Sequence, residues 1–297
     1  MRAGAMVGVV ASFLAMGWAL DAFQDPFKEY PGWEYDKPED QSPYKKFPLP
    51  PDWNVPGEWT FARLMYPTTS EYIDWQSTYR AGFDWRQGVT NWTIDYPRSD
   101  RHLAAAIRRL TRVQAKSVEQ PINLEADDDA FNYPWLYAAE TGHWELTDRQ
   151  IVKLREYLLR GGFFMCDDFH GTVEWDVFSR TMLKVFPDRP IVDLRNDDAI
   201  LHSVFDLDDR YQVPGAQYMQ THSICEKCAT YPTFGSGGET PHWRAIFDDR
   251  GRVMVAICHN MDLGDSWENA DDAEYPERFS ALGLRIGIDY AVYAMTH

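Results

Sequence analysis

Residues 133–171, YPWLYAAETGHWELTDRQIVKLREYLLRGGFFMCDDFHG, hold the pattern that decides the fold. The segment opens with an apolar run, ending at Ala139, that predicts a buried strand. Thr147 and Gln150 have the spacing of a capping box, so we expect a helix to begin there and to end at the glycine pair that follows. The apolar residues 163–166 predict the next buried strand. Strand, helix and strand in this order are typical of a parallel sheet.

The same alternation continues on both sides of this segment. Upstream, we expect a strand over residues 60–66, a helix capped by Ser99, and a short strand over residues 122–124. Downstream, a helix with one apolar face ends at Pro187, two apolar strands flank a turn at residues 248–251, and a largely buried helix closes the chain. The pattern predicts a three-layer, doubly wound α/β fold with a mostly parallel sheet and a late antiparallel hairpin.

The composition limits the classes of function. The chain has 297 residues, with 29 Lys and Arg against 46 Asp and Glu, which gives a net charge of −17. A surface this acidic repels phosphate backbones, so we expect no nucleic-acid partner. Hydrophobic residues make up 44% of the chain and aromatic residues 15%, which is enough to bury a large core.

The N-terminal part differs in character from the rest. Residues 1–22 predict an export signal, because an uncharged run from Ala3 to Leu20 precedes small residues suited to cleavage. A membrane anchor is the alternative, since this run just reaches the length of a short spanning helix. Residues 23–58 combine eight prolines with aromatic side chains and predict an extended arm that either packs on the domain or binds a partner or ligand. Residues 59–297 then form a single α/β domain.

Polar residues follow three of the expected strands. Ligands bind beyond the carboxyl ends of strands in open parallel sheets, because loops and helix N-termini meet there. If the three strands run in one direction, these residues share one rim of the sheet. Glu140 and Thr141 begin the first of these polar runs. We predict a ligand-binding site at the rim, formed by His143, Trp144, Asp167, Asp168, His170, His259, Asn260, Asp262, Asp265, Trp267 and Glu268.

The same rim contains the imidazole and carboxylate groups that Zn²⁺ or Fe²⁺ sites use. Candidate ligands of a divalent metal are His143, Asp168 and His259, although no His-Glu-x-x-His spacing occurs. The structural alternative is that Asp167 and Asp168 cap the following helix and that the histidines hydrogen-bond loop backbone. If carboxylates and imidazoles share one pocket, we expect the carboxylates to raise the pKa of the imidazoles.

The chain has four cysteines. Cys166 and Cys258 end apolar strands, and we expect them to be small buried hydrophobic residues. Cys225 and Cys228 lie in a loop-like region, and in an exported chain we expect a disulfide between them. Zinc binding together with His222 is the alternative, although this half-motif lacks a second cysteine pair.

The chain resembles the bacterial family called domain of unknown function 4159 in four runs: FARLMYP (61–67), the run 133–171, GRVMVAICHNMDLGDSWE (251–268) and IDYAVYAMTH (288–297). The resemblance covers about residues 59–297. It implies a flavodoxin-like fold, similar to the class I glutamine amidotransferase-like superfamily, and export or membrane association, but no established reaction. Glutaminase activity is not expected, because the turn after Ala139 has no cysteine nucleophile. The residues that match the family's motifs are Gly161, Gly162, Asp167, Asp168, Gly171, His259, Asn260, Asp262, Gly264, Trp267 and Glu268.

Three functions from different classes fit these observations. The first is non-catalytic binding of a polar small molecule, such as a carbohydrate, at the carboxyl rim. The second is metal-assisted hydrolysis by the same Asp and His residues, and the third is a structural role as a partner in an envelope complex. No nucleotide-binding fingerprint occurs, so a divalent metal is the one cofactor that the sequence suggests. We expect a periplasmic or secreted protein with no membrane span in the mature chain.

Overall fold

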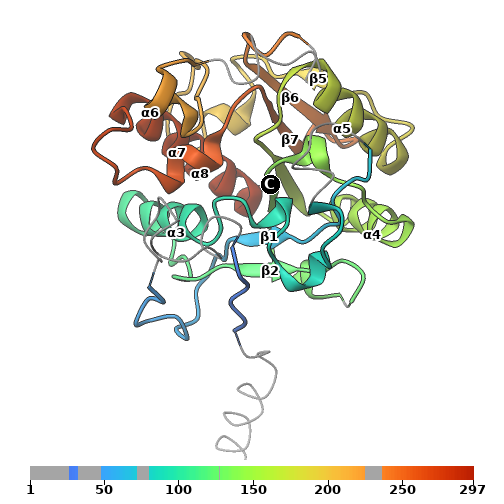
Figure 1. Cartoon of the computed structure of the whole chain (residues 1–297), viewed down its shortest axis with the longest axis horizontal. Coiled ribbons are helices and arrows are strands. Elements are labelled where there is room, and N and C mark those ends of the chain that lie inside the picture. The colour runs from blue at the N-terminus through green and yellow to red at the C-terminus, as the bar shows by residue number, and fades with distance from the viewer. Residues whose placement is uncertain (1–26, 33–47, 72–79, 127, 225–235) are drawn as a thin grey trace, which may run out of the picture.

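The structure is a computed structural model that describes residues 27–32, 48–71, 80–126, 128–224 and 236–297. Within these residues seven strands form one sheet with the order β2, β1, β3, β4, β7, β6, β5. The strands from β2 to β7 in this order are parallel, β6 is antiparallel to β7, and β5 is antiparallel to β6. The predicted fold, a mostly parallel sheet with a late antiparallel hairpin, is confirmed (Figure 1).

The central strands are buried on both faces, which explains their continuous apolar sequences. The strand predicted over residues 60–66 is shorter than expected, and the one predicted over residues 122–124 begins at Gln120. The bounds of the strands are β1 Ala62–Leu64, β2 Gln120–Ile122, β3 Trp135–Ala138, β4 Phe163–Cys166, β5 Val192–Asp193, β6 His242–Phe247 and β7 Val253–His259.

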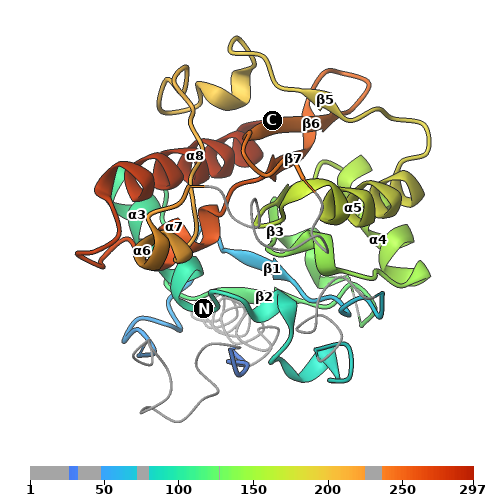
Figure 2. The ribbon, with the colours of Figure 1, turned by 45° about the horizontal axis from the view of Figure 1, so that its top comes forward.

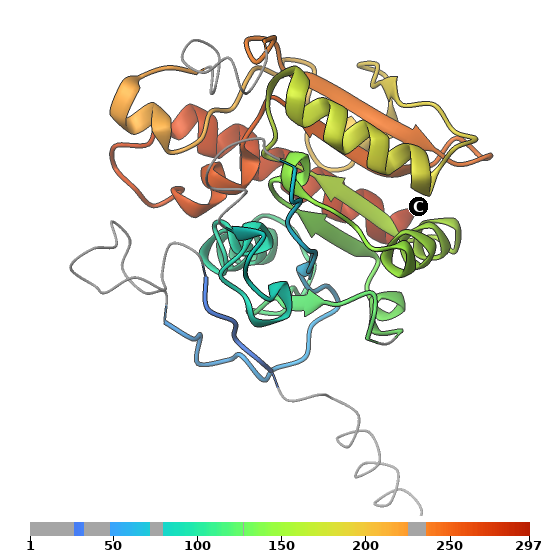
Figure 3. The same cartoon turned by 45° about the vertical axis from the view of Figure 1, so that its right-hand side comes forward.

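Helices cover both faces of the sheet (Figures 1 and 3). One face packs against α3, α7 and α8, which contribute Leu103, Trp267 and Ile286 to its core. The other face packs against α4 and α5, through Leu154 and Phe178. Among the described residues the α-helices are α3 Arg98–Leu110, α4 Asp148–Leu159, α5 Gly171–Val185, α6 Gln217–Thr221, α7 Leu263–Glu268 and α8 Glu277–Thr296.

The helix starts are partly as predicted. The capping box of Thr147 and Gln150 begins α4, as expected. Ser99 does not cap α3, because the helix already begins at Arg98 and the Ser99 hydroxyl accepts a hydrogen bond from the buried Arg63 at 3.0 Å.

Aromatic side chains pack α7 against β3 and the residue that precedes β1. The ring of Tyr137 lies 5.2 Å from Phe61 and 5.4 Å from Trp267, measured between centroids. Each such pair contributes about 0.5–1.5 kcal/mol beyond the area it buries. The last turn of α7, which carries Trp267, is therefore fixed against the sheet.

The strand order reverses beside β1. The chain passes from β1 to β2 on one side and returns to β3 on the other, so loops from both directions meet above β1 and β3. Figure 2 shows the parallel strands side by side between the two helical layers. The register aligns Ala138 of β3 with Cys166 of β4, and Cys166 with Ile257 of β7, so these strands end at one rim. Such a reversal point is where open α/β sheets bind ligands.

The described parts of the N-terminal arm pack on the domain. The backbone N–H of Tyr30 donates to the hydroxyl oxygen of Tyr96 at 3.1 Å. The export signal predicted for residues 1–22 lies outside the described residues, as do Cys225 and Cys228 of the predicted disulfide. None of the helices in the described part of the chain combines the length and apolar character that crossing a bilayer requires.

Candidate functional site

The turn after β3 holds Glu140 in a left-handed backbone conformation, with φ of 46° and ψ of 41°. Residues other than glycine rarely adopt this conformation, and such strain concentrates at functional sites. The Tyr66 hydroxyl fixes the turn by donating to the carbonyl oxygen of Ala139 at 2.6 Å. Arg80 donates to Glu140 Oε2 at 3.0 Å, and Asn91 Nδ2 donates to the same oxygen. The reversal point of the sheet therefore carries a carboxylate paired with a buried guanidinium.

The first acidic residue after β4, Asp167, points toward α7 and is fully buried. Its Oδ2 accepts hydrogen bonds from the backbone N–H groups of Leu263 at 2.7 Å and Gly264 at 2.9 Å, and from the Tyr137 hydroxyl at 3.3 Å. Burial, and then the charge of Asp168, raises the pKa of Asp167 well above its usual range. Asp167 thus binds a helix N-terminus, but that helix is α7 and not the one that follows β4.

The second acidic residue after β4, Asp168, is also left-handed, with φ of 52°. Its Oδ1 lies 3.3 Å from Nε2 of His170. Left-handed residues other than glycine also occur at Asp95, Glu140 and Asn260, with φ of 57°, 46° and 65°. All four lie on loops at the carboxyl rim. Val89 and His222 are the other two non-glycine residues with positive φ among the described residues, so four of these six lie where the ends of the parallel strands meet.

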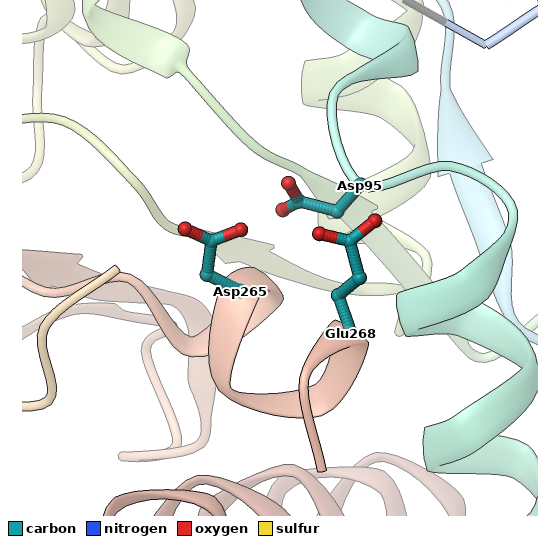
Figure 4. A group of neighbouring side chains, drawn as sticks. All are labelled: Asp95, Asp265 and Glu268. Atoms are coloured by element: carbon teal, nitrogen blue, oxygen red, sulfur yellow. The ribbon is translucent and has the colours of Figure 1, made fainter. Parts of the chain in front are cut away.

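Five carboxylates gather at this rim and are called the acidic cluster: Asp95, Asp168, Asp262, Asp265 and Glu268. Oxygen atoms of Asp95, Asp168 and Asp262 lie within 4.8 Å of one another, and so do oxygen atoms of Asp95, Asp265 and Glu268. Figure 4 shows the second set, in which the two carboxylates on α7 point toward Asp95. Asp95 comes from the loop before α3, Asp168 from the turn after β4, and Asp262 caps α7. Three segments far apart in the sequence thus build the cluster.

Arg63 and Gly264 determine where Asp95 lies. Arg63 is a fully buried residue of β1 that donates to two backbone carbonyls of the Asp95 loop, each at 3.1 Å, and forms an ion pair with Asp100. Gly264, in the first turn of α7, allows close approach, because a Cβ atom there would lie only 2.3 Å from Asp95 Oδ2. The loop is therefore held from the sheet side by a guanidinium and packs directly on the backbone of α7.

Ionised carboxylates this close together repel one another. Two unit charges 4.8 Å apart repel by about 3.5 kcal/mol at an effective dielectric constant of about 20, so three ionised groups repel by about 10 kcal/mol. Protons, a basic side chain or a cation can offset this repulsion. The donors are carboxylate oxygens only, which Mg²⁺, Ca²⁺ and Mn²⁺ prefer as ligands. The cluster is therefore suited to a hard divalent cation.

Two of the three predicted metal ligands lie elsewhere. His143 Nε2 lies 3.1 Å from Glu174 Oε1, and the other oxygen of Glu174 accepts from the His170 backbone N–H at 2.6 Å. Within the described residues, His143, Asp168 and His259 do not form a group close enough to share a metal ion. Of these three, only Asp168 belongs to the acidic cluster.

His259 is buried in an aromatic stack. Its ring centroid lies 4.9 Å from that of Trp175 and 5.0 Å from that of Phe169, and its Nε2 lies 3.1 Å from the carbonyl oxygen of Gly171. Burial lowers the pKa of His259 to about 3, so its ring is neutral near neutral pH. The expectation that carboxylates raise the pKa of the rim imidazoles is wrong for His259, because desolvation dominates and Arg244 acts in the same direction.

Other predicted site residues brace loops or fill the core. Asn260 Oδ1 accepts from the Gly171 N–H at 2.8 Å, and its Nδ2 donates to the carbonyl oxygen of Gly237 at 2.8 Å. Trp144 and Trp267 are 1% and 0% exposed, so neither ring has a free face for a ligand. The predicted site residues that the structure brings together in the acidic cluster are Asp168, Asp262, Asp265 and Glu268.

The sequence did not indicate the importance of Asp95 and Glu140. Glu140 begins the polar run after β3, so the rule that ligand groups follow strand ends could have included it. Asp95 lies in a long loop without strand or helix periodicity, and long-range contacts, among them those of Arg63 and Gly264, bring it to α7. No local sequence signal marks that position.

The fold and the rim together define an α/β protein of flavodoxin-like fold with a cluster of carboxylates at the carboxyl ends of its strands. Comparison with protein families matches residues 85–295 to the family described as Domain of unknown function (DUF4159). The match covers well over half of the chain, and the chain belongs to this family, as its resemblance indicated. The runs 133–171 and 251–268 lie within the matched residues, whereas the run 61–67 precedes them. A search of curated proteins gave no match.

Proposed function

We propose that this protein binds a divalent cation of the Mg²⁺, Ca²⁺ or Mn²⁺ type through Asp95, Asp168 and Asp262, and that the cation helps to bind a polar small molecule at the carboxyl rim. The observation that carries the proposal is the approach of three buried carboxylates to within 4.8 Å of one another. A divalent cation converts their mutual repulsion, about 10 kcal/mol when all are ionised, into attraction.

Two fully buried oxygen atoms at the ends of neighbouring strands support a ligand. Thr141 Oγ1, after β3, and Asp167 Oδ1, after β4, have no hydrogen-bond partner among the described residues. A buried polar atom without a partner costs about 1–3 kcal/mol, so native proteins satisfy such atoms with water, an ion or a ligand. Both atoms lie at the edge of the sheet where a ligand is expected.

The coordination chemistry favours a ligand rich in oxygen. Mg²⁺ takes about six oxygen ligands and Ca²⁺ about six to eight. Three carboxylates that each contribute one oxygen do not complete such a shell. Hydroxyl or anionic oxygens of a small molecule, or water, complete the shell. The site thus suits the polar small molecule that the sequence suggested.

Metal-assisted hydrolysis is the second candidate function. His170 favours it, because Nε2 of this buried imidazole lies 3.3 Å from Oδ1 of the cation ligand Asp168. An imidazole beside a cation can accept a proton from water that the cation activates. Turnover of an ester by the cation-loaded protein distinguishes this function from binding alone.

Calorimetric titration of the purified full chain with MgCl₂, CaCl₂ or MnCl₂ tests the proposal. We expect saturable binding of at least one cation, and an affinity that falls by about tenfold or more in Asp262→Asn, which removes one charged ligand. Asp249→Asn is the matched control, because this exposed aspartate lies in the hairpin at the opposite end of β7 and should not alter binding. Absence of binding to all three cations in the wild-type protein would reject the proposal.

Export is proposed separately, on the basis of the uncharged run in residues 1–22. The mass of the mature protein tests it, since a cleaved signal removes about 22 residues. A role as an envelope partner, with the arm as the docking element, is tested by co-purification with and without residues 23–58.

A further inference from the structure

Asp95 belongs to both carboxylate sets of the acidic cluster. It lies within 4.8 Å of Asp168 and Asp262 in one set and of Asp265 and Glu268 in the other. Two-metal sites hold their cations about 3.5–4 Å apart, a spacing that the two oxygens of one carboxylate can bridge. We propose that the cluster holds two divalent cations bridged by Asp95, and that the pair binds a phosphoryl group of a small-molecule ligand. This inference rests on the proposed function, which supplies the first cation.

The spacing along α7 directs Asp265 and Glu268 to the same side of the helix. They are three residues apart, and both approach Asp95. Asp262 is the N-cap of the same helix and contributes to the other carboxylate set. Asp95 faces this side across Gly264. A second cation between Asp95 and α7 would attract these carboxylates, which otherwise repel one another.

The charge of the cluster also favours two cations. Five ionised carboxylates carry five negative charges, of which one divalent cation offsets two and a pair offsets four. The buried guanidinium of Arg63 is already in an ion pair with Asp100. Every member of the cluster except Asp265 is buried, so solvent screens the remaining charge poorly. A pair of divalent cations therefore offsets more of the charge of this cluster than a single cation does.

The buried side chain of Asp167, which is not a member of the acidic cluster, also supports a ligand at this place. Its Oδ2 accepts from the Gly264 N–H at 2.9 Å, and the same glycine packs against Asp95 Oδ2. Its Oδ1 is fully buried and has no hydrogen-bond partner in the described part of the chain. This unsatisfied oxygen belongs to the carboxyl group that bonds to Gly264, the residue packed against Asp95, and water bound beside the cations can satisfy it.

The chemistry of a cation pair indicates the ligand class. Two divalent cations at this spacing bind separate oxygens of one tetrahedral anion, and a phosphoryl group supplies such oxygens with a matching negative charge. The acidic chain otherwise repels phosphate, because its net charge is −17. Phosphate binding should therefore depend strictly on both cations.

Titration of the full chain with MnCl₂, followed by the electron paramagnetic resonance signal of free Mn²⁺, counts the cations. We expect two Mn²⁺ per wild-type chain with a spin-coupled spectrum at low temperature, and one uncoupled Mn²⁺ in Glu268→Gln. Asp249→Asn should behave as wild type. Calorimetry should detect inorganic phosphate binding to the Mn²⁺-loaded wild type and at least a tenfold loss in Glu268→Gln, which corresponds to about 1.4 kcal/mol.

The possible outcomes separate the two proposals. One Mn²⁺ in the wild type, unchanged in Glu268→Gln, overturns the cation pair and leaves the single-cation site intact. No Mn²⁺ binding in the wild type overturns the cation pair, and the single-cation site is overturned with it if MgCl₂ and CaCl₂ also give no binding. Phosphate binding that is equal in wild type and Glu268→Gln overturns the assigned ligand class. Circular dichroism of each variant confirms folding, and if Glu268→Gln does not fold, Asp265→Asn gives the same test on the other ligand of the second cation.

Discussion

Replacing Gly264 by Ala tests whether contact between α7 and the Asp95 loop positions the acidic cluster. The added Cβ would lie 2.3 Å from Asp95 Oδ2 and 2.8 Å from Tyr137 Oη. Atoms of this kind normally remain about 3.4 Å or more apart, so the Asp95 carboxylate must move by about 1 Å. The substitution therefore displaces the residue that belongs to both carboxylate sets without removing any carboxylate from the chain.

The magnitude follows from two opposing effects. Overpacking of this kind costs about 1–3 kcal/mol, and alanine in place of glycine in a helix recovers up to about 1 kcal/mol. We expect the free energy of unfolding to fall by about 1–2 kcal/mol. We also expect the Mn²⁺ affinity to fall by about tenfold or more, because metal ligands must lie within about 0.2 Å of their required distances.

Urea unfolding measured by tryptophan fluorescence gives the stability, and calorimetric Mn²⁺ titration gives the affinity. A double-mutant cycle with Asp95→Ala identifies the cause, since removing the carboxylate should abolish most of the stability cost of Gly264→Ala. Wild-type stability and wild-type Mn²⁺ affinity in Gly264→Ala would refute the reasoning, because Asp95 would then not depend on this contact.

Three further changes have defined outcomes. Asp168→Asn should raise the thermal midpoint of the cation-free protein by a few degrees, because it removes like-charge repulsion, and should weaken Mn²⁺ binding; a lowered midpoint would contradict this. His259→Ala should lower the free energy of unfolding by about 2–4 kcal/mol in a urea titration, because it empties a buried stack, and an altered Mn²⁺ affinity would place His259 in the site after all. Burial raises the pKa of Asp289 from 3.8 to about 6, so its contribution to stability is complete below about pH 4 and is lost as the pH rises through about 6. Relative to Asp289→Asn, the free energy of unfolding of the wild type should therefore fall by up to about 3 kcal/mol between about pH 4 and pH 7.5. If the free energies of unfolding of wild type and variant instead change in parallel with pH, Asp289 does not titrate in this range.

The fold could be predicted where burial imposes a pattern on the sequence. Strands β3 and β4 are covered on both faces, so nearly every residue in them must be apolar, and the capping box of α4 is a local signal with a local cause. Strand β5 could not be predicted, because Val192 and Asp193 are both exposed and are held only by pairing with β6. Backbone pairing of two residues leaves no periodicity in the sequence.

The position of the site could be predicted, but much of its composition could not. Asp168, Asp262, Asp265 and Glu268 follow strand ends, which is why the rule for parallel sheets identified them. The same rule selected His143 and His259, whose side chains bond to Glu174 and to the Gly171 carbonyl oxygen. A residue at a strand end can bind a ligand or hydrogen-bond to neighbouring protein groups, and the sequence does not distinguish these two roles. Asp95 was missed because long-range contacts alone place it.

The two outermost strands of the sheet are short. β2 has three residues and includes Pro121, which has no backbone N–H, and β5 has two residues. An exposed strand edge is a template on which other chains can add strands and aggregate. The number of free backbone donors and acceptors along the edge limits how much of another strand can pair with it. Because both borders of the described sheet are short, they provide little template for intermolecular β-structure.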